Sequence, residues 1–128
     1  SMFSWRHVEG VAVAAIAAHS LVVGLVLLVV PGWAASFGGW GEADQLFFIR
    51  QGGAFHLVVA AGYMVEYLRH RSVSLMLIAK SLAVVFLGVS WAMDPGVWAV
   101  PLAAVGDGLM AVVVWWIHRR ASAPITPG

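Results

Sequence analysis

The chain has 128 residues, of which 62% are hydrophobic and only 10% are charged, against about 45–50% and about 25% in soluble proteins, and this composition excludes an ordinary soluble domain. Seven Lys and Arg against six Asp and Glu leave a net charge of +1, which is too small for the basic surface that nucleic-acid phosphates require, so no nucleic-acid partner is expected. Because the chain has no cysteine, disulfides, thiolate nucleophiles and Cys-based metal sites are excluded as well.

Four hydrophobic segments follow one another along the chain. Each has about 21–23 residues, enough at about 1.5 Å per residue to cross a hydrocarbon core of about 30 Å. We therefore predict an all-α, integral membrane four-helix bundle, formed by one domain at residues 2–120. The predicted spans are residues 8–30, 45–67, 72–92 and 97–117. Residues 121–128 are rich in Pro, Ser, Thr and Gly and are predicted to form a disordered tail.

The connection at 31–44, between the first two spans, is too short and too apolar to be a soluble domain. It contains Trp33, Phe37 and Trp40 among several glycines. This pattern is typical of a short helix lying in the membrane interface. An apolar loop would have the same composition, and both interpretations stay open.

Basic residues predict the orientation of the bundle. With four spans, the two termini and the connection between the second and third spans lie on one side, which holds five arginines: Arg6, Arg69, Arg71, Arg119 and Arg120. The other side holds only acidic charges: Glu42, Asp44 and Asp94. By the positive-inside rule, both termini are predicted to be cytoplasmic, in a multi-pass protein of the cell inner membrane. All seven tryptophans lie near predicted span ends, as expected for residues at the membrane interfaces.

Small residues predict close helix packing. Gly10, Ala14 and Ala18 recur at four-residue spacing in the first span, and Gly52 and Gly53 are adjacent in the second. Such residues let helix backbones approach closely, within one bundle or between protomers. A homo-oligomer is therefore left open beside the lipid bilayer as a partner.

Each predicted span contributes one ionisable residue to a common layer. Counted from the predicted cytoplasmic ends, the four residues lie within about 5 Å of one another in depth, near the midplane; they are His19, His56, Lys80 and Asp107. A Lys or Asp at the bilayer centre costs about 2.5–3.5 kcal/mol even on the most lenient insertion scale. The layer therefore predicts a set of partnered or functional groups.

Lys80 and Asp107 are the natural pair in this layer. Their spans are joined by the tight turn Asp94-Pro95-Gly96, so the two helices should be antiparallel neighbours. The pair could be a buried ion pair that fixes how the two helices dock. It could also be part of a site, because Gly106 and Gly108 leave the backbone beside Asp107 bare.

His19 and His56 have three interpretations. They could ligate a haem, bind the polar head of a lipophilic molecule, or relay protons. Their surroundings match no haem motif, and no H-x-x-x-H or E-x-x-H pair for a metal occurs on any predicted helix. No metal is therefore expected, and a quinone fits this sequence better than haem.

The second span extends the candidate site. Gly52, His56, Tyr63 and Tyr67 recur at helical spacing, with Glu66 three residues after Tyr63, and form a stripe from the midplane to the cytoplasmic surface. Arg50 would either reach outward past Trp40 or set a positive field at the outer mouth of a pocket. At the cytoplasmic edge, Glu9 and Glu66 are expected to pair with arginines: Arg6, Arg69 or Arg71.

Several short strings resemble one known family. The first span closes on Pro31-Gly32, the second opens with FFIRQGGAFHLVVAAGY, a basic turn follows, and the last span contains VGDGLMA. In this order the features resemble the DoxX-like group of small four-helix bacterial membrane proteins. The resemblance covers most of the chain and implies a four-helix bundle, linked in some members to quinone-coupled oxidation. Only Arg50, with Gly52 and Gly53, carries over from the group's recurrent Arg and Gly-rich stretch.

These observations predict that the protein binds a small lipophilic molecule, quinone-, sterol- or isoprenoid-like, in a polar pocket at the midplane, with transformation of that molecule left open. In a reaction, Asp107 or His56 would exchange the proton and Lys80 would offset developing negative charge. The residues expected to bind the ligand are His19, Arg50, Tyr63 and Glu66. Two alternatives use the same layer: a proton- or ion-coupled small transporter, and a structural accessory subunit of a membrane complex.

Overall fold

The computed structural model describes residues 4–124, and this part of the chain is helical without strands. Its helices are α1 (Trp5–Val29), α2 (Pro31–Gly38), α3 (Phe47–His70), α4 (Ser74–Met93) and α5 (Ala99–Ala121). The four long helices coincide with the four predicted segments to within four residues at each end. Of the predicted tail, residues 125–128 lie outside the described residues.

The connection after α1 contains a helix, so of its two interpretations the helical one is correct. α2 begins at Pro31, whose fixed φ suits a first helical position. It ends at Gly39, which has a φ of 100° and donates its backbone N–H to the Ser36 carbonyl. That left-handed conformation favours glycine.

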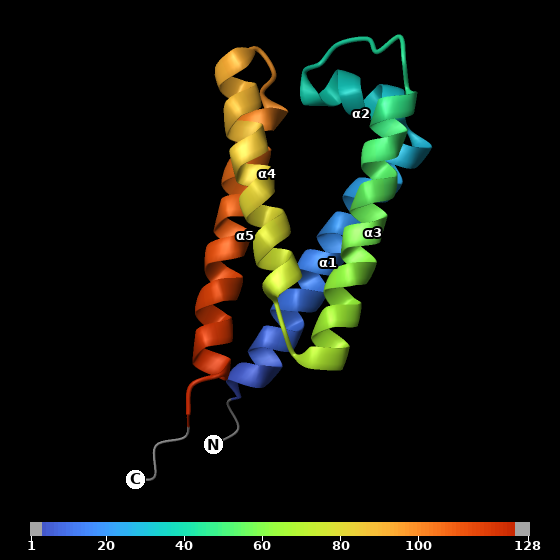
Figure 1. Ribbon diagram of the computed structural model, residues 1–128. Helices are drawn as coiled ribbons and strands as arrows, with labels where there is room; N and C mark the ends of the chain where they lie inside the picture. The colour runs from blue at the N-terminus through green and yellow to red at the C-terminus, as the bar shows by residue number, and fades with distance from the viewer. Residues whose placement is uncertain (1–3, 125–128) are drawn as a thin grey trace.

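The four long helices form two pairs that spread apart like a V (Figure 1). α1 packs along α3, and α4 packs along α5. The pairs meet near the two termini, where α1 also contacts α5, and they diverge toward α2. α3 and α4 are joined by a short turn, yet they contact one another much less than the members of each pair do. Space between the pairs therefore opens toward the α2 end.

Three helices are long and apolar enough to cross a membrane, judged by length and composition: α1, α4 and α5. Their most apolar stretches have mean hydropathies of 2.5, 2.0 and 1.8. α3 has 24 residues but includes Arg50, His56 and Glu66, which lower its hydropathy. The composition of α3 alone therefore does not identify it as a span.

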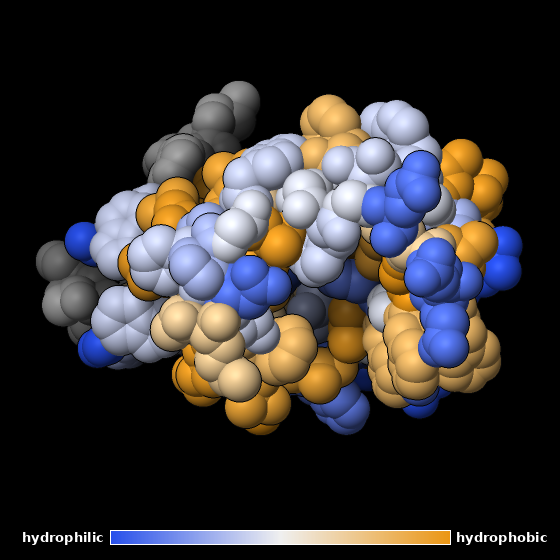
Figure 2. All heavy atoms as spheres, turned by 90° about the horizontal axis from the view of Figure 1, so that it is seen from above, coloured by the Kyte–Doolittle hydropathy of each residue, from blue (hydrophilic) through white to orange (hydrophobic). Residues whose placement is uncertain are grey.

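Buried side chains concentrate where the two pairs meet. The core cluster joins α1, α3, α4 and α5 through residues such as Val13, Tyr63, Met76 and Val114. Large apolar side chains elsewhere point outward; Phe86, for example, is 70% exposed. Seen from the α2 end, the molecule is hollowed between the two pairs (Figure 2). An apolar exterior around a small core is typical of helices that face lipid.

Candidate functional site

Lys80 of α4 and Asp107 of α5 form a direct ion pair. The Lys80 ammonium donates a hydrogen bond to Asp107 Oδ1 at 2.8 Å, and only 5% and 16% of the two side chains are exposed. The predicted pairing is therefore correct in its geometry. Because each charge neutralises the other, the pair adds no net charge to the interior.

A cavity of about 170 Å³, open to the outside on one side and called the inner cavity below, lies beside this ion pair. Residues from α1, α3, α4 and α5 line it: Ser20, Phe55, His56, Val59, Tyr63, Ala79, Lys80, Ala83 and Asp107. Four of the polar residues expected from the sequence thus lie around one space: His56, Tyr63, Lys80 and Asp107. A cavity of this size has room for about five water-sized groups.

Two residues that line the inner cavity each have a buried polar atom without a hydrogen-bond partner. Ser20 Oγ and His56 Nδ1 are both buried and lack a hydrogen bond within the described part of the chain. Leaving such groups unpaired costs about 1–3 kcal/mol each. In native structures an unpaired buried polar group usually marks a position for water or a ligand. Ser20 and His56 are therefore candidates for contact with water or with a polar group of a ligand.

The structure does not bring His19 or Arg50 to this cavity. His19 is exposed on α1, and the residue next to it, Ser20, lines the cavity instead. One residue corresponds to about 100° of rotation around a helix, so the two side chains face different directions. Arg50 is also exposed and lines neither this cavity nor the larger one described next. The expectation that these two residues share the pocket is wrong in geometry.

A larger outer cavity of about 660 Å³ lies toward the α2 end. Its lining comes from Leu27 of α1, from α2 and the loop after it, from α3 and from Phe86 of α4, and includes Glu42 as its charged residue. Most of the other lining side chains are apolar, among them Leu27, Trp40 and Phe48. His56 lines both cavities, so its imidazole marks the place where they adjoin.

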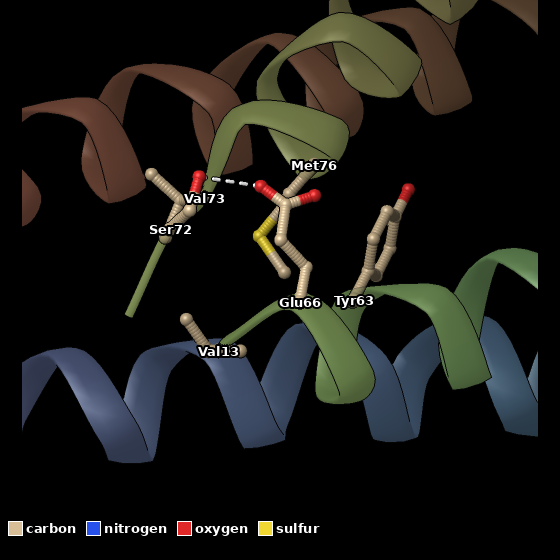
Figure 3. Close-up of a pocket in the computed structure, with 6 residues that line it drawn as sticks. All are labelled: Val13, Tyr63, Glu66, Ser72, Val73 and Met76. Carbon is tan, nitrogen blue, oxygen red and sulfur yellow. Dashed lines mark hydrogen bonds between the residues drawn. The ribbon is translucent and has the colours of Figure 1, made fainter. Parts of the chain in front are cut away.

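Toward the termini, the helices close. Between Tyr63 and the terminal end of the bundle lies a hollow that is too small for a water molecule. It is lined by Val13, Tyr63, Glu66, Ser72, Val73 and Met76 (Figure 3). Within it the Glu66 carboxylate accepts a hydrogen bond from Ser72 Oγ at 2.5 Å and another from the Leu75 amide at 3.1 Å. Glu66 thus caps the beginning of α4 and does not pair with an arginine as expected. The Tyr63 hydroxyl points away from Glu66 (Figure 3).

Glu9 forms a second polar cluster that the sequence did not indicate. It is 4% exposed and accepts a hydrogen bond from the Tyr67 hydroxyl at 3.1 Å. Its other oxygen pairs with Nδ1 of His118 on α5. The Arg71 guanidinium reaches Glu9 only indirectly, through a hydrogen bond of 3.3 Å to the Tyr67 hydroxyl. The predicted Glu9–Arg pairs are therefore wrong, and the only signal for this cluster was a Glu at the start of one long helix and a His at the end of another.

No group of three metal-ligating side chains occurs among residues 4–124. In comparisons with known proteins, no family model, curated protein or solved structure matches the chain. The function must therefore be argued from the cavities and the side chains that line them.

Proposed function

We propose that this chain is a four-span membrane protein that binds a small lipophilic molecule, with the polar end of that molecule in the inner cavity. In this proposal α3 crosses the bilayer beside the three more apolar helices, because it is equally long and packs along the length of α1. The five arginines near the terminal end of the bundle would face the cytoplasm of a cell inner membrane. The same architecture is implied by the resemblance to DoxX-like proteins.

The observation that supports ligand binding most directly is the pair of unpaired polar atoms, Ser20 Oγ and His56 Nδ1. Their residues line a cavity that is otherwise apolar except for Tyr63 and the ion pair. A ligand carbonyl or hydroxyl group would satisfy them, while apolar side chains such as Phe55 and Val59 hold its hydrocarbon part. If the bound molecule exchanges a proton, the His56 imidazole and the Tyr63 hydroxyl are lining groups that would exchange it.

Binding is favoured over transport by the closed region below Tyr63. The hollow there has no room for water, so no water-filled path leads through it from the inner cavity to the polar groups nearer the termini. The polar layer would therefore serve a pocket that ends near the midplane.

Binding of a decyl-substituted benzoquinone by the detergent-solubilised protein tests the proposal. We expect Ser20→Ala and His56→Phe each to weaken binding by about fivefold, the effect of one lost hydrogen bond. His19→Ala is the matched control, because His19 is exposed and lies outside the cavity. Equal affinities in wild type, Ser20→Ala and His56→Phe would contradict the proposal, as would a loss confined to His19→Ala.

A further inference from the structure

The two cavities together restrict the chemistry of the ligand. His56 lines both of them, so the two cavities are neighbours at this residue, and a single molecule that fills both would have to pass it. The inner cavity, at about 170 Å³, is smaller than the roughly 300–1,000 Å³ of typical small-molecule sites. The outer cavity, at about 660 Å³, lies within that range. A compact head with a long chain fits this combination.

The charges around the two cavities exclude an anionic head. Lys80 is the one cationic side chain on either lining, and its ammonium is already bound to Asp107. The charged residue of the outer lining is Glu42, an acid. A phosphate or carboxylate head would therefore be buried without a free cation, which is costly in a site of low polarity.

The groups that still have hydrogen-bonding capacity are neutral hydroxyls and an imidazole. Ser20 Oγ and His56 Nδ1 have no partner, and the Tyr63 hydroxyl makes no hydrogen bond within the described residues. Such groups complement carbonyl and hydroxyl oxygens. All three residues line the inner cavity, so a head of that kind would meet them there after small rotations of the Ser20 and His56 side chains.

The walls of the outer cavity indicate how the chain of the ligand would lie. α2 and the loop after it bound the cavity at one end, and α3 and Phe86 of α4 bound it where these two helices diverge (Figure 1). Because α3 and α4 contact each other little beyond their turn, the side between them is open to the surroundings of the bundle. In a bilayer, those surroundings are acyl chains.

We propose that the ligand is a neutral amphiphile, with a carbonyl- or hydroxyl-bearing head in the inner cavity and one hydrocarbon chain in the outer cavity, admitted from the leaflet at the α2 end between α3 and α4. This inference rests on the proposed function, since it names the class of molecule that the same site binds. It adds two claims that binding alone does not require: selection against an anionic head, and use of the outer cavity.

Two probes with the same chain test the first claim. They are 1-monooleoylglycerol, which is neutral, and 1-oleoyl-lysophosphatidic acid, which adds a phosphate to the same glycerol. Native mass spectrometry of the solubilised protein would measure the binding of each. We expect the phosphate to weaken binding by about tenfold or more, because it brings an unpaired charge. Equal or tighter binding of the phosphate, or no binding of 1-monooleoylglycerol, overturns the inference.

Filling each cavity separately tests the second claim. Gly52 lines the outer cavity, and a Cβ there would meet only Leu27 Cδ1, at 4.0 Å. Gly52→Leu should therefore fold and should reduce 1-monooleoylglycerol binding by about tenfold through lost space. Gly88→Leu is the control, because a Cβ at Gly88 has no atom within 4 Å and Gly88 lines neither cavity. Melting temperatures of both variants would verify that they fold.

Ala83→Leu separates the two proposals, because Ala83 lines only the inner cavity. Loss of decyl-benzoquinone binding in Ala83→Leu supports the inner site. If 1-monooleoylglycerol binding is unchanged in Gly52→Leu while Ala83→Leu abolishes binding of the quinone probe, the outer cavity is not used and only the inference fails. If Ala83→Leu leaves binding of both probes intact, the inner site is not used and the proposed function fails with it.

Discussion

Gly24 of α1 and Gly53 of α3 lie directly against each other where the two helices cross. A Cβ added to Gly24 would be 2.8 Å from the Gly53 carbonyl oxygen, and one added to Gly53 would be 2.7 Å from the Gly24 carbonyl oxygen. Both distances are shorter than any Cβ normally allows, and the atoms met are backbone. The absence of side chains therefore allows the backbones of α1 and α3 to touch.

The first prediction concerns this crossing. Gly24→Ala or Gly53→Ala should destabilise the protein by about 1–3 kcal/mol, because the helices must separate to admit a methyl group. Gly106→Ala should be neutral or slightly stabilising, since a Cβ there has no atom within 4 Å and alanine favours a helix. Unfolding followed by circular dichroism in detergent measures the difference. Equal stabilities of the Gly53→Ala and Gly106→Ala variants would show that the crossing tolerates a side chain.

The second prediction concerns the buried ion pair. Lys80→Met or Asp107→Leu alone leaves one charge without its partner and should cost about 3–5 kcal/mol. The double variant removes both charges and should recover much of that stability. The free energies of unfolding of the four proteins form a double-mutant cycle. Strictly additive losses would mean that the two side chains do not interact in the folded protein.

The third prediction concerns the cluster around Glu9. Because the Glu9 carboxylate connects Tyr67 of α3 with His118 of α5, Glu9→Ala should cost about 1–3 kcal/mol by leaving buried groups unpaired. Tyr67→Phe removes a single hydroxyl and should cost less. Asp44→Asn is the control, because this substitution also removes one negative charge, but at an exposed position. Thermal melts of the three variants would rank them, and a Glu9→Ala melt equal to that of Asp44→Asn would refute the prediction.

The fourth prediction concerns whether α3 spans the membrane. Two variants each carry a single cysteine, one in place of Asp44 before α3 and the other in place of His70 at the end of α3. Both positions are exposed. In intact cells an impermeant thiol reagent should label Asp44→Cys, whereas His70→Cys should require permeabilisation. The native chain has no cysteine and serves as the background. Labelling of both variants from the same side would show that α3 does not cross.

Gly39 lies in the same connection as Asp44, but it is less suitable as a position for the labelling cysteine. It has a φ of 100°, and a Cβ there would be 2.9 Å from a ring carbon of Trp98. A side chain at Gly39 would therefore disturb the contact between α2 and the turn before α5, where Trp98 Nε1 donates to the Phe37 carbonyl at 2.9 Å.

The sequence was sufficient to predict features that depend on position along the helices. The extents of the long helices follow from the lengths of the apolar runs, and the Lys80–Asp107 contact follows from opposite charges at similar depth on helices joined by a tight turn. Rotation about a helix axis could not be predicted in the same way. His19 and Ser20 lie at nearly the same depth, yet packing against α3 decides that Ser20 faces the cavity.

Partners far apart in the sequence were also beyond prediction. Charge alone favoured arginine for Glu9, but the meeting of α1 with α5 brings His118 to it across 109 residues. The cavities likewise arise from the angle between the two helix pairs. No single segment of sequence encodes that angle.

The mutual neutralisation of Lys80 and Asp107 has an electrical consequence. A membrane potential does work only on net charge that moves through it, about 2.3 kcal/mol per elementary charge for each 100 mV. A paired ammonium and carboxylate that stay in place, together with an uncharged ligand, move none. If the proposed uncharged ligand binds there, occupancy of the site in energised vesicles should be the same with and without an applied potential, and the concentration of that ligand in the bilayer would set it.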